Sequence, residues 1–302
     1  MQLKITINRS KMSYNVDVLC PNLCRLGEGP CWDAPNQRLL FVDIEKSTVH
    51  RWNYSTLSLQ APLKLNGPYV SAVVPRENGG FVVAAYDRFA SLNEVTGLSS
   101  TIAKVPLNEQ VKFNDGKCDP AGRFWAGTGG TTNETKQGYL YTLNTDKTVT
   151  TKISDVILSN GLSWSPDHTK MYFIDTPTYN VLAYDYDVNT GAIANPQLLL
   201  KFDKWKDGTP DGQCNDANGN LWVAMYGGGR VIKVDASTGQ KVERISVSTS
   251  ALKITSCCFG GPDLNELFVT SASSDEPVGD AGSLFKVTGL QAKGRLSTPY
   301  KG

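Results

Sequence analysis

The chain has 302 residues, 40% of them hydrophobic, and its 30 Lys and Arg against 29 Asp and Glu give a formal net charge of +1. This balance favours neither nucleic acid nor a charged membrane surface as a partner. No apolar run approaches transmembrane length, and the opening residues lack the apolar centre of a signal peptide. We therefore expect a cytoplasmic protein that is a monomer or a weak homodimer.

The seven cysteines are odd in number, and their spacing fits neither a CxxC zinc site nor a disulfide framework. We expect reduced and mostly buried thiols, as is usual in a reducing compartment, where a Cys20–Cys24 disulfide is disfavoured. The cysteines are Cys20, Cys24, Cys31, Cys118, Cys214, Cys257 and Cys258.

The chain starts with a segment that we interpret as an N-terminal tail, residues 1–13, in which Met12 is an alternative start. Residues 14–302 are predicted to form one domain. Tyr14 to Leu19 alternates apolar and polar residues, as a half-buried strand does. The repeats described next would form a closed ring if strands from both ends of the chain shared one unit. We therefore expect this strand to pair near Ser283 to Val287 and Gly294 to Ser297.

One pattern then recurs six times: a turn cluster rich in Pro, Asp, Asn and Gly, an apolar strand, and a further strand. Units of about 40–50 residues with about four short strands are typical of propeller blades. No segment has a sustained helical period. The sequence predicts an all-β, six-bladed β-propeller of four-stranded blades rather than a β-sandwich with accidental spacing. The apolar anchors, 41 to 50 residues apart, are Leu40, Phe81, Phe124, Met171, Leu221 and Leu267.

The innermost strand of each blade lines the central channel, and it should precede the anchor by one strand and one turn. A polar residue stands ten to twelve positions before every anchor, at the start of an otherwise apolar strand. Glycine follows three of these residues directly, and it lets backbones approach one another closely. The six polar residues are Glu28, Ser71, Asn114, Asn160, Asp211 and Ser256.

Four of these six positions carry a carboxylate or a carboxamide, and this set favours a metal site over polar residues that merely face water. Two carboxylates confined at one axis repel each other unless a cation neutralises them. Oxygen-only donors suit calcium, magnesium or manganese, whereas zinc usually takes His or Cys. Neither His50 nor His168 falls at an inner position. The sequence gives them a surface or structural role and supports no His-based catalytic dyad or triad.

Several segments resemble the regucalcin, gluconolactonase and luciferin-regenerating-enzyme family: GEGPCWD, FNDGKCDPAGRFWAGT, SNGLSWSPDHTKMYFID, PDGQCNDANGNLWVA and SCCFGGPDLNELFVTSA. The resemblance extends from about Val18 to Tyr300, and FNDGK, GGRVIKVD and TSCCFGG look most similar to its animal regucalcin branch. It implies a six-bladed propeller with one divalent cation, calcium first and zinc, manganese or magnesium as alternatives. The implied metal ligands are Glu28, Asn160 and Asp211, and the implied substrate-binding residue is Asn114.

Two features depart from that family pattern. Lys112 stands where the vertebrate branch has an Arg, so a bidentate contact to a polyhydroxy substrate is lost. The segment Gly129-Gly130-Thr131-Thr132 replaces a longer, acidic stretch that approaches the substrate in relatives. We expect Lys112 still to bind substrate. We also expect the glycine pair to form a mobile lid over the substrate.

The resemblance implies metal-dependent hydrolysis of lactones of the gluconolactone type, with Asp211 as the base that activates water. One alternative is a luciferin-regenerating enzyme that acts on a nitrile or an ester. The other is a calcium-binding regulatory protein without significant turnover.

Overall fold

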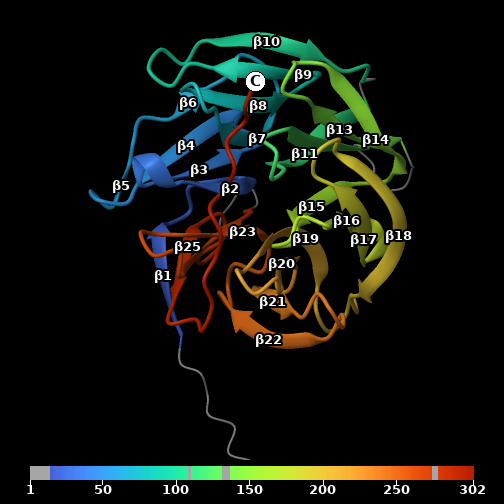
Figure 1. Ribbon diagram of the computed structural model, residues 1–302. Helices are drawn as coiled ribbons and strands as arrows, with labels where there is room; N and C mark the ends of the chain where they lie inside the picture. Colours follow the sequence, from blue (N-terminus) through green and yellow to red (C-terminus); the bar gives the residue numbers. More distant parts are fainter. Residues whose placement is uncertain (1–13, 108–109, 131–136, 274–277) are drawn as a thin grey trace, which may run out of the picture.

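The computed structural model describes residues 14–107, 110–130, 137–273 and 278–302. Within these residues lie 25 strands and two short 3-10 helices, η1 (Ala34–Asn36) and η2 (Thr176–Thr178). The strands form six sheets arranged as blades around one axis (Figure 1), which confirms the predicted six-bladed all-β propeller. The interpretation of residues 1–13 as a tail falls outside the described residues. No helix in the described ranges is long and apolar enough to span a membrane.

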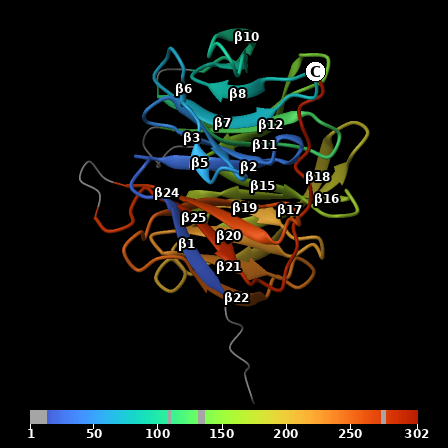
Figure 2. The ribbon, with the colours of Figure 1, turned by 90° about the vertical axis from the view of Figure 1, so that its left-hand side faces the viewer.

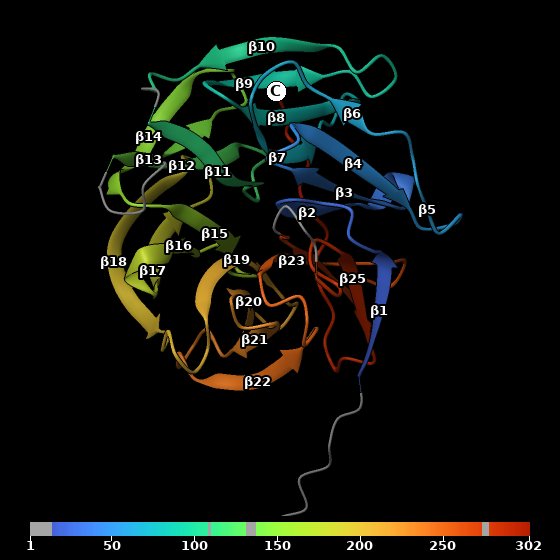
Figure 3. The same cartoon turned by 180° about the vertical axis from the view of Figure 1, so that it is seen from behind.

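Each blade runs from the axis outward, and we number the blades one to six by their innermost strands (Figure 3). The innermost strands are β2 (Gly27–Asp33), β7 (Val70–Pro75), β11 (Val111–Cys118), β15 (Ser159–Trp164), β19 (Thr209–Asn215) and β23 (Ile254–Gly260). The second strands are β3 (Arg38–Asp43), β8 (Phe81–Ala85), β12 (Phe124–Gly130), β16 (Lys170–Asp175), β20 (Leu221–Tyr226) and β24 (Glu266–Ser271).

The two outer positions complete each blade. The third strands are β4 (Thr48–Asn53), β9 (Arg88–Leu92), β13 (Gly138–Leu143), β17 (Asn180–Asp187), β21 (Arg230–Val234) and β25 (Leu284–Thr288). The outermost strands of blades two to six are β10 (Ser99–Lys104), β14 (Val149–Val156), β18 (Ala192–Lys201), β22 (Lys241–Ser246) and β1 (Asn15–Cys20). In blade one, β5 (Ser58–Leu59) and β6 (Leu63–Lys64) both pair with β4 and share the outer position.

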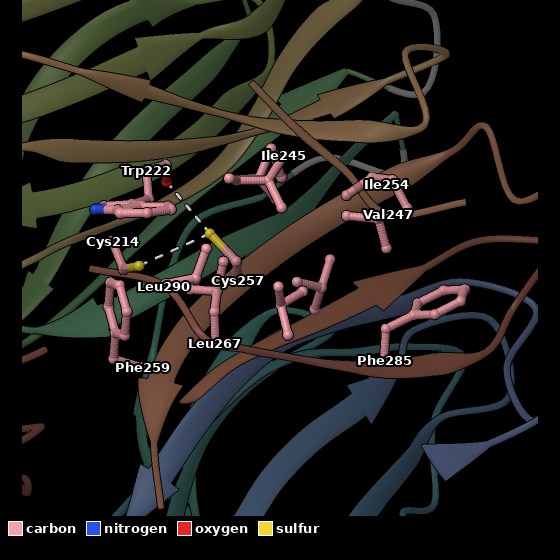
Figure 4. Packing of buried hydrophobic residues seen from close by; sticks show 14 of the residues in the cluster. Cys214, Trp222, Ile245, Val247, Ile254, Cys257, Phe259, Leu267, Phe285 and Leu290 are labelled. Carbon is pink, nitrogen blue, oxygen red and sulfur yellow. Dashed lines mark hydrogen bonds between the residues drawn. The ribbon is translucent and has the colours of Figure 1, made fainter. Parts of the chain in front are cut away.

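The hydrophobic core consists of layers between neighbouring blades. All six predicted anchor side chains are 0% exposed. One layer packs Trp222 and Ile245 of blade five against Leu267 and Phe285 of blade six (Figure 4). Because neighbouring blades cover both faces of the second strands, these strands read as continuous apolar runs in place of alternating ones.

Ring closure is confirmed at its first predicted contact. β1 pairs antiparallel with β25, with Val16 opposite Val287 (Figure 2). The second predicted contact is wrong: Gly294 forms a bridge with Asp216 of blade five instead. Blade six is complete once β1 has joined it, so the C-terminal segment crosses the open end of the ring in Figure 1, and Tyr300 bridges Arg76 beyond β7.

Buried aspartates organise the predicted turn clusters. Asp119 accepts hydrogen bonds from the backbone N–H groups of Ala121 and Arg123, at 3.0 and 2.9 Å, and from Trp125 Nε1 at 2.9 Å. Asp216 accepts equivalent bonds from the backbone of Asn218 and from the Trp222 indole. In blades three and five these carboxylates thus fix the turn that leads from the innermost strand to the second strand.

Candidate functional site

All six innermost strands contain a register shift near their start, at the level of the predicted polar residues. The shifts fall at Glu28/Cys31, Val70/Ala72, Phe113/Gly116, Asn160/Leu162, Pro210/Gln213 and Ile254/Ser256. A bulge frees residues from the ladder and re-aims their side chains, and bulges are common beside active sites. The same irregularity in every blade therefore marks one level of the channel.

The structure brings Glu28, Asn160 and Asp211 together as neighbours at this level, all of them buried. Glu28 Oε2 accepts a hydrogen bond from the Gly29 N–H at 3.0 Å. The Asn160 amide donates to Thr176 Oγ1 at 2.9 Å. Asn160 Oδ1 and Asp211 Oδ1 are buried, and in the part of the chain that the structure describes neither has a hydrogen-bond partner. We call these three residues the axial site.

Gly161 explains how two of these residues come so close. A Cβ atom at this position would lie 2.7 Å from the carbonyl oxygen of Asp211, nearer than real side-chain carbons approach. The glycine therefore lets β15 pack directly on β19, and it places Asn160 beside Asp211. This agrees with the prediction that glycines after the polar residues allow close backbone approach.

A third carboxyl, Asp115, belongs to the same electrostatic group. Burial raises the pKa of Glu28 well above its usual value, and the charges of Asp211 and Asp115 raise it further. Burial also raises the pKa of Asp211, as does Asp115, whereas the Asn160 amide lowers it. Burial raises the pKa of Asp115, and Lys117 opposes this shift. Three buried carboxyls, together with the unpartnered oxygens of Asn160 and Asp211, match the donors that a hard divalent cation takes.

The sequence does not single out Asp115, because the repeat spacing assigns one axial position to each blade and gives it to Asn114. The shift in β11 spans Phe113 to Gly116, so it frees two consecutive residues from the ladder. The two adjacent polar residues in FNDG are the only sequence signal for this second axial side chain.

The two predicted substrate-binding residues, Lys112 and Asn114, lie in β11 on either side of Phe113. Asn114 is half-buried, and its amide donates to the carbonyl oxygen of Ser159 at 2.9 Å. Lys112 Nζ lies 4.6 Å from the centre of the Tyr69 ring, a cation–π contact. Burial lowers the pKa of Lys112, while Glu45 raises it. The contact with Tyr69 holds the ammonium at the side of blade two.

The expectation of a mobile glycine lid is wrong for the glycines themselves. Gly129 and Gly130 belong to β12, where they pair with Lys112 and Val111. A Cβ at Gly129 would lie 2.4 Å from Leu158 Cδ1, so close packing between blades three and four explains this glycine. Thr131 and Thr132 lie outside the described residues. The pair thus forms part of the wall that holds Lys112.

Further along the innermost strands the channel widens into a cavity of about 250 Å³. Its lining includes Lys117, Cys118 and Cys214, and the C-terminal residues Arg295 to Thr298. Lys117 Nζ donates to the carbonyl oxygen of Gln213 at 2.5 Å. Asp115 and Ser256 of the axial level also line the cavity, together with residues that follow the axial positions, so the cavity extends from the axial level toward the C-terminal segment.

The predicted state of the thiols agrees with the structure. All seven cysteines are free, and all but Cys31 are buried. The Sγ atoms of Cys214 and Cys257 lie 3.7 Å apart and form a hydrogen bond, not a disulfide (Figure 4). Burial raises the pKa of Cys20 and of Cys31 to about 11, which keeps these thiols protonated at neutral pH.

Comparisons with known proteins agree with this architecture. A family model described as SMP-30/Gluconolactonase/LRE-like region matches residues 26–273. Regucalcin of Gallus gallus is 42% identical over 304 residues, which cover 96% of this chain and 99% of that protein. A solved luciferin-regenerating enzyme has a TM-score of 0.88 at 34% identity, covering 96% of this chain and all 100% of its own.

A calcium-binding protein from Agrobacterium tumefaciens, described as regucalcin, has a TM-score of 0.85 at 27% identity, with 95% of this chain and 97% of that chain covered. The likenesses in sequence and in structure both extend over almost the whole chain. The chain therefore belongs to the SMP-30/gluconolactonase/LRE-like family.

Proposed function

We propose that this protein is a divalent-metal-dependent hydrolase of lactones of the gluconolactone type. Membership of its family supports a lactonase-like or calcium-binding function. One observation carries the choice of site: the unpartnered, buried oxygens of Asn160 and Asp211 stand among three buried carboxyls. Oxygen donors of this kind favour calcium, with magnesium, manganese and zinc as alternatives.

Glu28, Asn160 and Asp211 would hold the cation, which would supply Lewis acidity toward the lactone carbonyl. Asp211 is also the proposed base, which would accept the proton of the attacking water. One N–H of the Asn114 amide is engaged with Ser159, which fixes the side chain and leaves its second N–H and its Oδ1 for substrate hydroxyls. Lys112 offers its ammonium to substrate oxygens from the Tyr69 wall.

The deciding experiment measures hydrolysis of a small panel of aldonolactones by metal-stripped protein, to which cations are returned one at a time. We expect no turnover without metal and recovery with calcium or another divalent ion. Asp211→Ala removes both metal and turnover. Asn114→Ala keeps the metal and lowers kcat/KM by about a hundredfold, as for loss of one stabilising donor. Asn218→Ala, at an exposed position in the turn after β19, is the matched control.

A second candidate is a calcium-binding protein without significant turnover, which the Agrobacterium tumefaciens relative favours. Such a protein would bind calcium tightly and leave every lactone intact. Substitution of Asn114 would then change nothing measurable, because Asn114 is not one of the proposed metal ligands. The structural likeness to a luciferin-regenerating enzyme favours a third candidate, hydrolysis of a nitrile or an ester. Those substrates belong in the same panel.

A further inference from the structure

A second group of potential metal ligands lies in blade one, away from the axial level. One ligand atom from each of Cys24, Asp43 and His50 falls within 4.8 Å of the others, and all three residues are buried. Cys24 precedes β2, Asp43 ends β3, and His50 lies in β4. The sequence predicts a surface or structural role for His50, and the cysteine spacing predicts no zinc site.

His50 is the unusual member of this group. Its side chain stacks on Phe41 with 5.0 Å between the ring centres, and the residue is only 7% exposed. Its Nε2 atom is buried and has no hydrogen-bond partner within the described ranges. A buried polar atom without a partner is destabilising unless something else binds it.

Part of the group has a purely structural explanation. Asp43 accepts hydrogen bonds from the backbone N–H groups of Arg25 and Leu26, at 2.9 and 3.2 Å. In blade four, Asp175 accepts the same pair of bonds from Ile157 and Leu158. In both blades an aspartate at the end of the second strand thus binds the backbone that leads into the innermost strand, a contact that we call the latch.

The latch does not explain the other two residues. In the register of blade four, Leu182 faces Phe173 as His50 faces Phe41. Val156 stands directly before the two hydrogen-bonded amides of blade four, and Cys24 stands directly before those of blade one. Apolar side chains are thus sufficient at both positions. Blade one instead carries a thiol and an imidazole there, the side chains that bind zinc best.

We propose that Cys24, Asp43 and His50 form a second metal site, specific for a zinc-like divalent ion. A thiolate, a carboxylate and a neutral imidazole around a divalent cation leave no net charge in the buried group. Lys46 Nζ lies 3.4 Å from Asp43 Oδ2, but its side chain is 48% exposed, so the ammonium can withdraw into solvent. Lys46→Met is therefore expected to tighten metal binding.

The location gives the site a structural purpose. The Cys24 N–H donates to the Gly282 carbonyl at 2.9 Å, and the Cys24 carbonyl accepts from Ser273 Oγ at 2.9 Å. Ser273 follows the end of β24 by two residues, and Gly282 precedes the start of β25 by two residues, so both partners belong to blade six. A metal bound by Cys24, Asp43 and His50 would tie blade six to blade one across the ring closure, as a staple.

Cobalt provides the test, because a cobalt–thiolate bond gives a charge-transfer absorption that oxygen ligands do not. We expect metal-stripped full-length protein to develop this band with one equivalent of Co²⁺ and to lose it on addition of Zn²⁺. Cys24→Val and His50→Leu carry the type of residue found in blade four, so they should fold and lack the band. The fold of each is checked by circular dichroism and melting.

Two controls separate this site from other possibilities. Cys257→Ser removes a thiol from the Cys214–Cys257 pair, which does not belong to the proposed site, and should keep the band. Asp211→Asn disables the all-oxygen axial site and should also keep it, so failure of the proposed function leaves this test intact. Absence of the band at excess cobalt would overturn the second site. So would a band that survives in Cys24→Val or disappears in Cys257→Ser.

Discussion

A single hydroxyl joins the side chain of Asn160 to the backbone beside Asp211. Thr176 Oγ1 accepts the Asn160 amide at 2.9 Å and donates to the Pro210 carbonyl at 3.0 Å. Thr176 is the first residue of η2, which follows directly on β16. The turn after the second strand of blade four thus sets the orientation of one proposed ligand relative to the strand that carries another.

The first prediction follows from this link. Thr176→Val keeps the shape of the side chain but removes the hydroxyl, so the Asn160 amide is free to rotate. Loss of such an orienting partner typically weakens metal binding by about 10- to 100-fold. Calorimetric titration with Ca²⁺ measures the change, and Thr176→Ser, which retains the hydroxyl, should bind like the wild type. Equal affinities in all three proteins would show that the link does not orient a ligand.

The second prediction concerns Asp115, and its two effects have opposite signs. Asp115→Asn removes one negative charge near the cation and should weaken calcium binding by roughly tenfold, about 1.4 kcal/mol. In metal-free protein the same change relieves repulsion with Glu28 and Asp211, so the melting temperature should rise. Melting curves with chelator and with calcium give both effects. A lower melting temperature in chelator would place Asp115 outside the repelling group.

The third prediction concerns removal of the metal. An ion that binds only the folded state stabilises it by about 2.7 kcal/mol at a hundredfold excess over its dissociation constant. Chelation should therefore lower the melting temperature, and calcium should restore it. Asp211→Asn protein is the control: added calcium should not change its melting temperature, and chelator should lower it only by the contribution of the proposed Cys24, Asp43 and His50 site. A wild-type protein indifferent to chelator would have a very weak axial site or none.

The fourth prediction is a pH dependence of the metal-free protein. Folding raises the pKa of Glu28 above 4.5 and that of Asp211 above 3.8. A carboxyl with a raised pKa in the folded state favours folding below its unfolded pKa, and this contribution is lost as pH rises through the folded value. With chelator, the contribution of these groups to the unfolding free energy should thus fall as the pH rises above about 4. Calcium should reverse the trend.

Glu28→Gln isolates this effect from the titration of other groups. The substitution removes one of the coupled carboxyls, so the metal-free variant should show a shallower decline than the wild type over the same range. Denaturant unfolding at several pH values gives the slopes. Parallel curves for the two proteins would exclude Glu28 as a source of the pH dependence.

The fold was predictable because one physical requirement is repeated six times. Each second strand is covered on both faces, so Leu40 and its five counterparts must be apolar, and a fixed turn must precede them. The positions of Glu28, Asn160 and Asp211 in the polar ring follow from the same spacing, since the innermost strand lies one turn before each anchor. The choice of these three among the six polar positions as metal ligands rests on the family resemblance. A periodic pattern thus locates both the core and the polar ring.

Features that break the repeat were not predictable in this way. Asp115 reaches the axial group through a register shift, which spacing alone does not reveal. Cys24, Asp43 and His50 meet only after β3 and β4 have paired and the chain from blade six has been latched to blade one. The path of the C-terminal segment depends on which strand edges remain free after ring closure. These outcomes depend on tertiary pairing in place of local pattern.

The last prediction concerns substrate choice. A site that hydrogen-bonds a substrate hydroxyl discriminates strongly against analogues that lack it, so the walls set specificity while the axial site sets the reaction. Lys112 holds a point charge against Tyr69, with 4.6 Å between Nζ and the ring centre. An Arg at this position can stack on the same ring and still present a planar fork of N–H donors to a sugar.

We therefore expect the wild type to hydrolyse gluconolactone weakly or moderately and to accept a broad range of lactones and esters. Lys112→Arg should raise kcat/KM for gluconolactone by about tenfold, the effect of roughly one added charged hydrogen bond, and should narrow the range. Lys112→Met, which keeps length but no charge, should lower activity on all polyhydroxy lactones. Since Gly129 and Gly130 are fixed in β12 beside Lys112, the gain should come from the new donors and not from closure of a lid. A wild type already selective for gluconolactone, made slower by Lys112→Arg, would contradict this account of the wall.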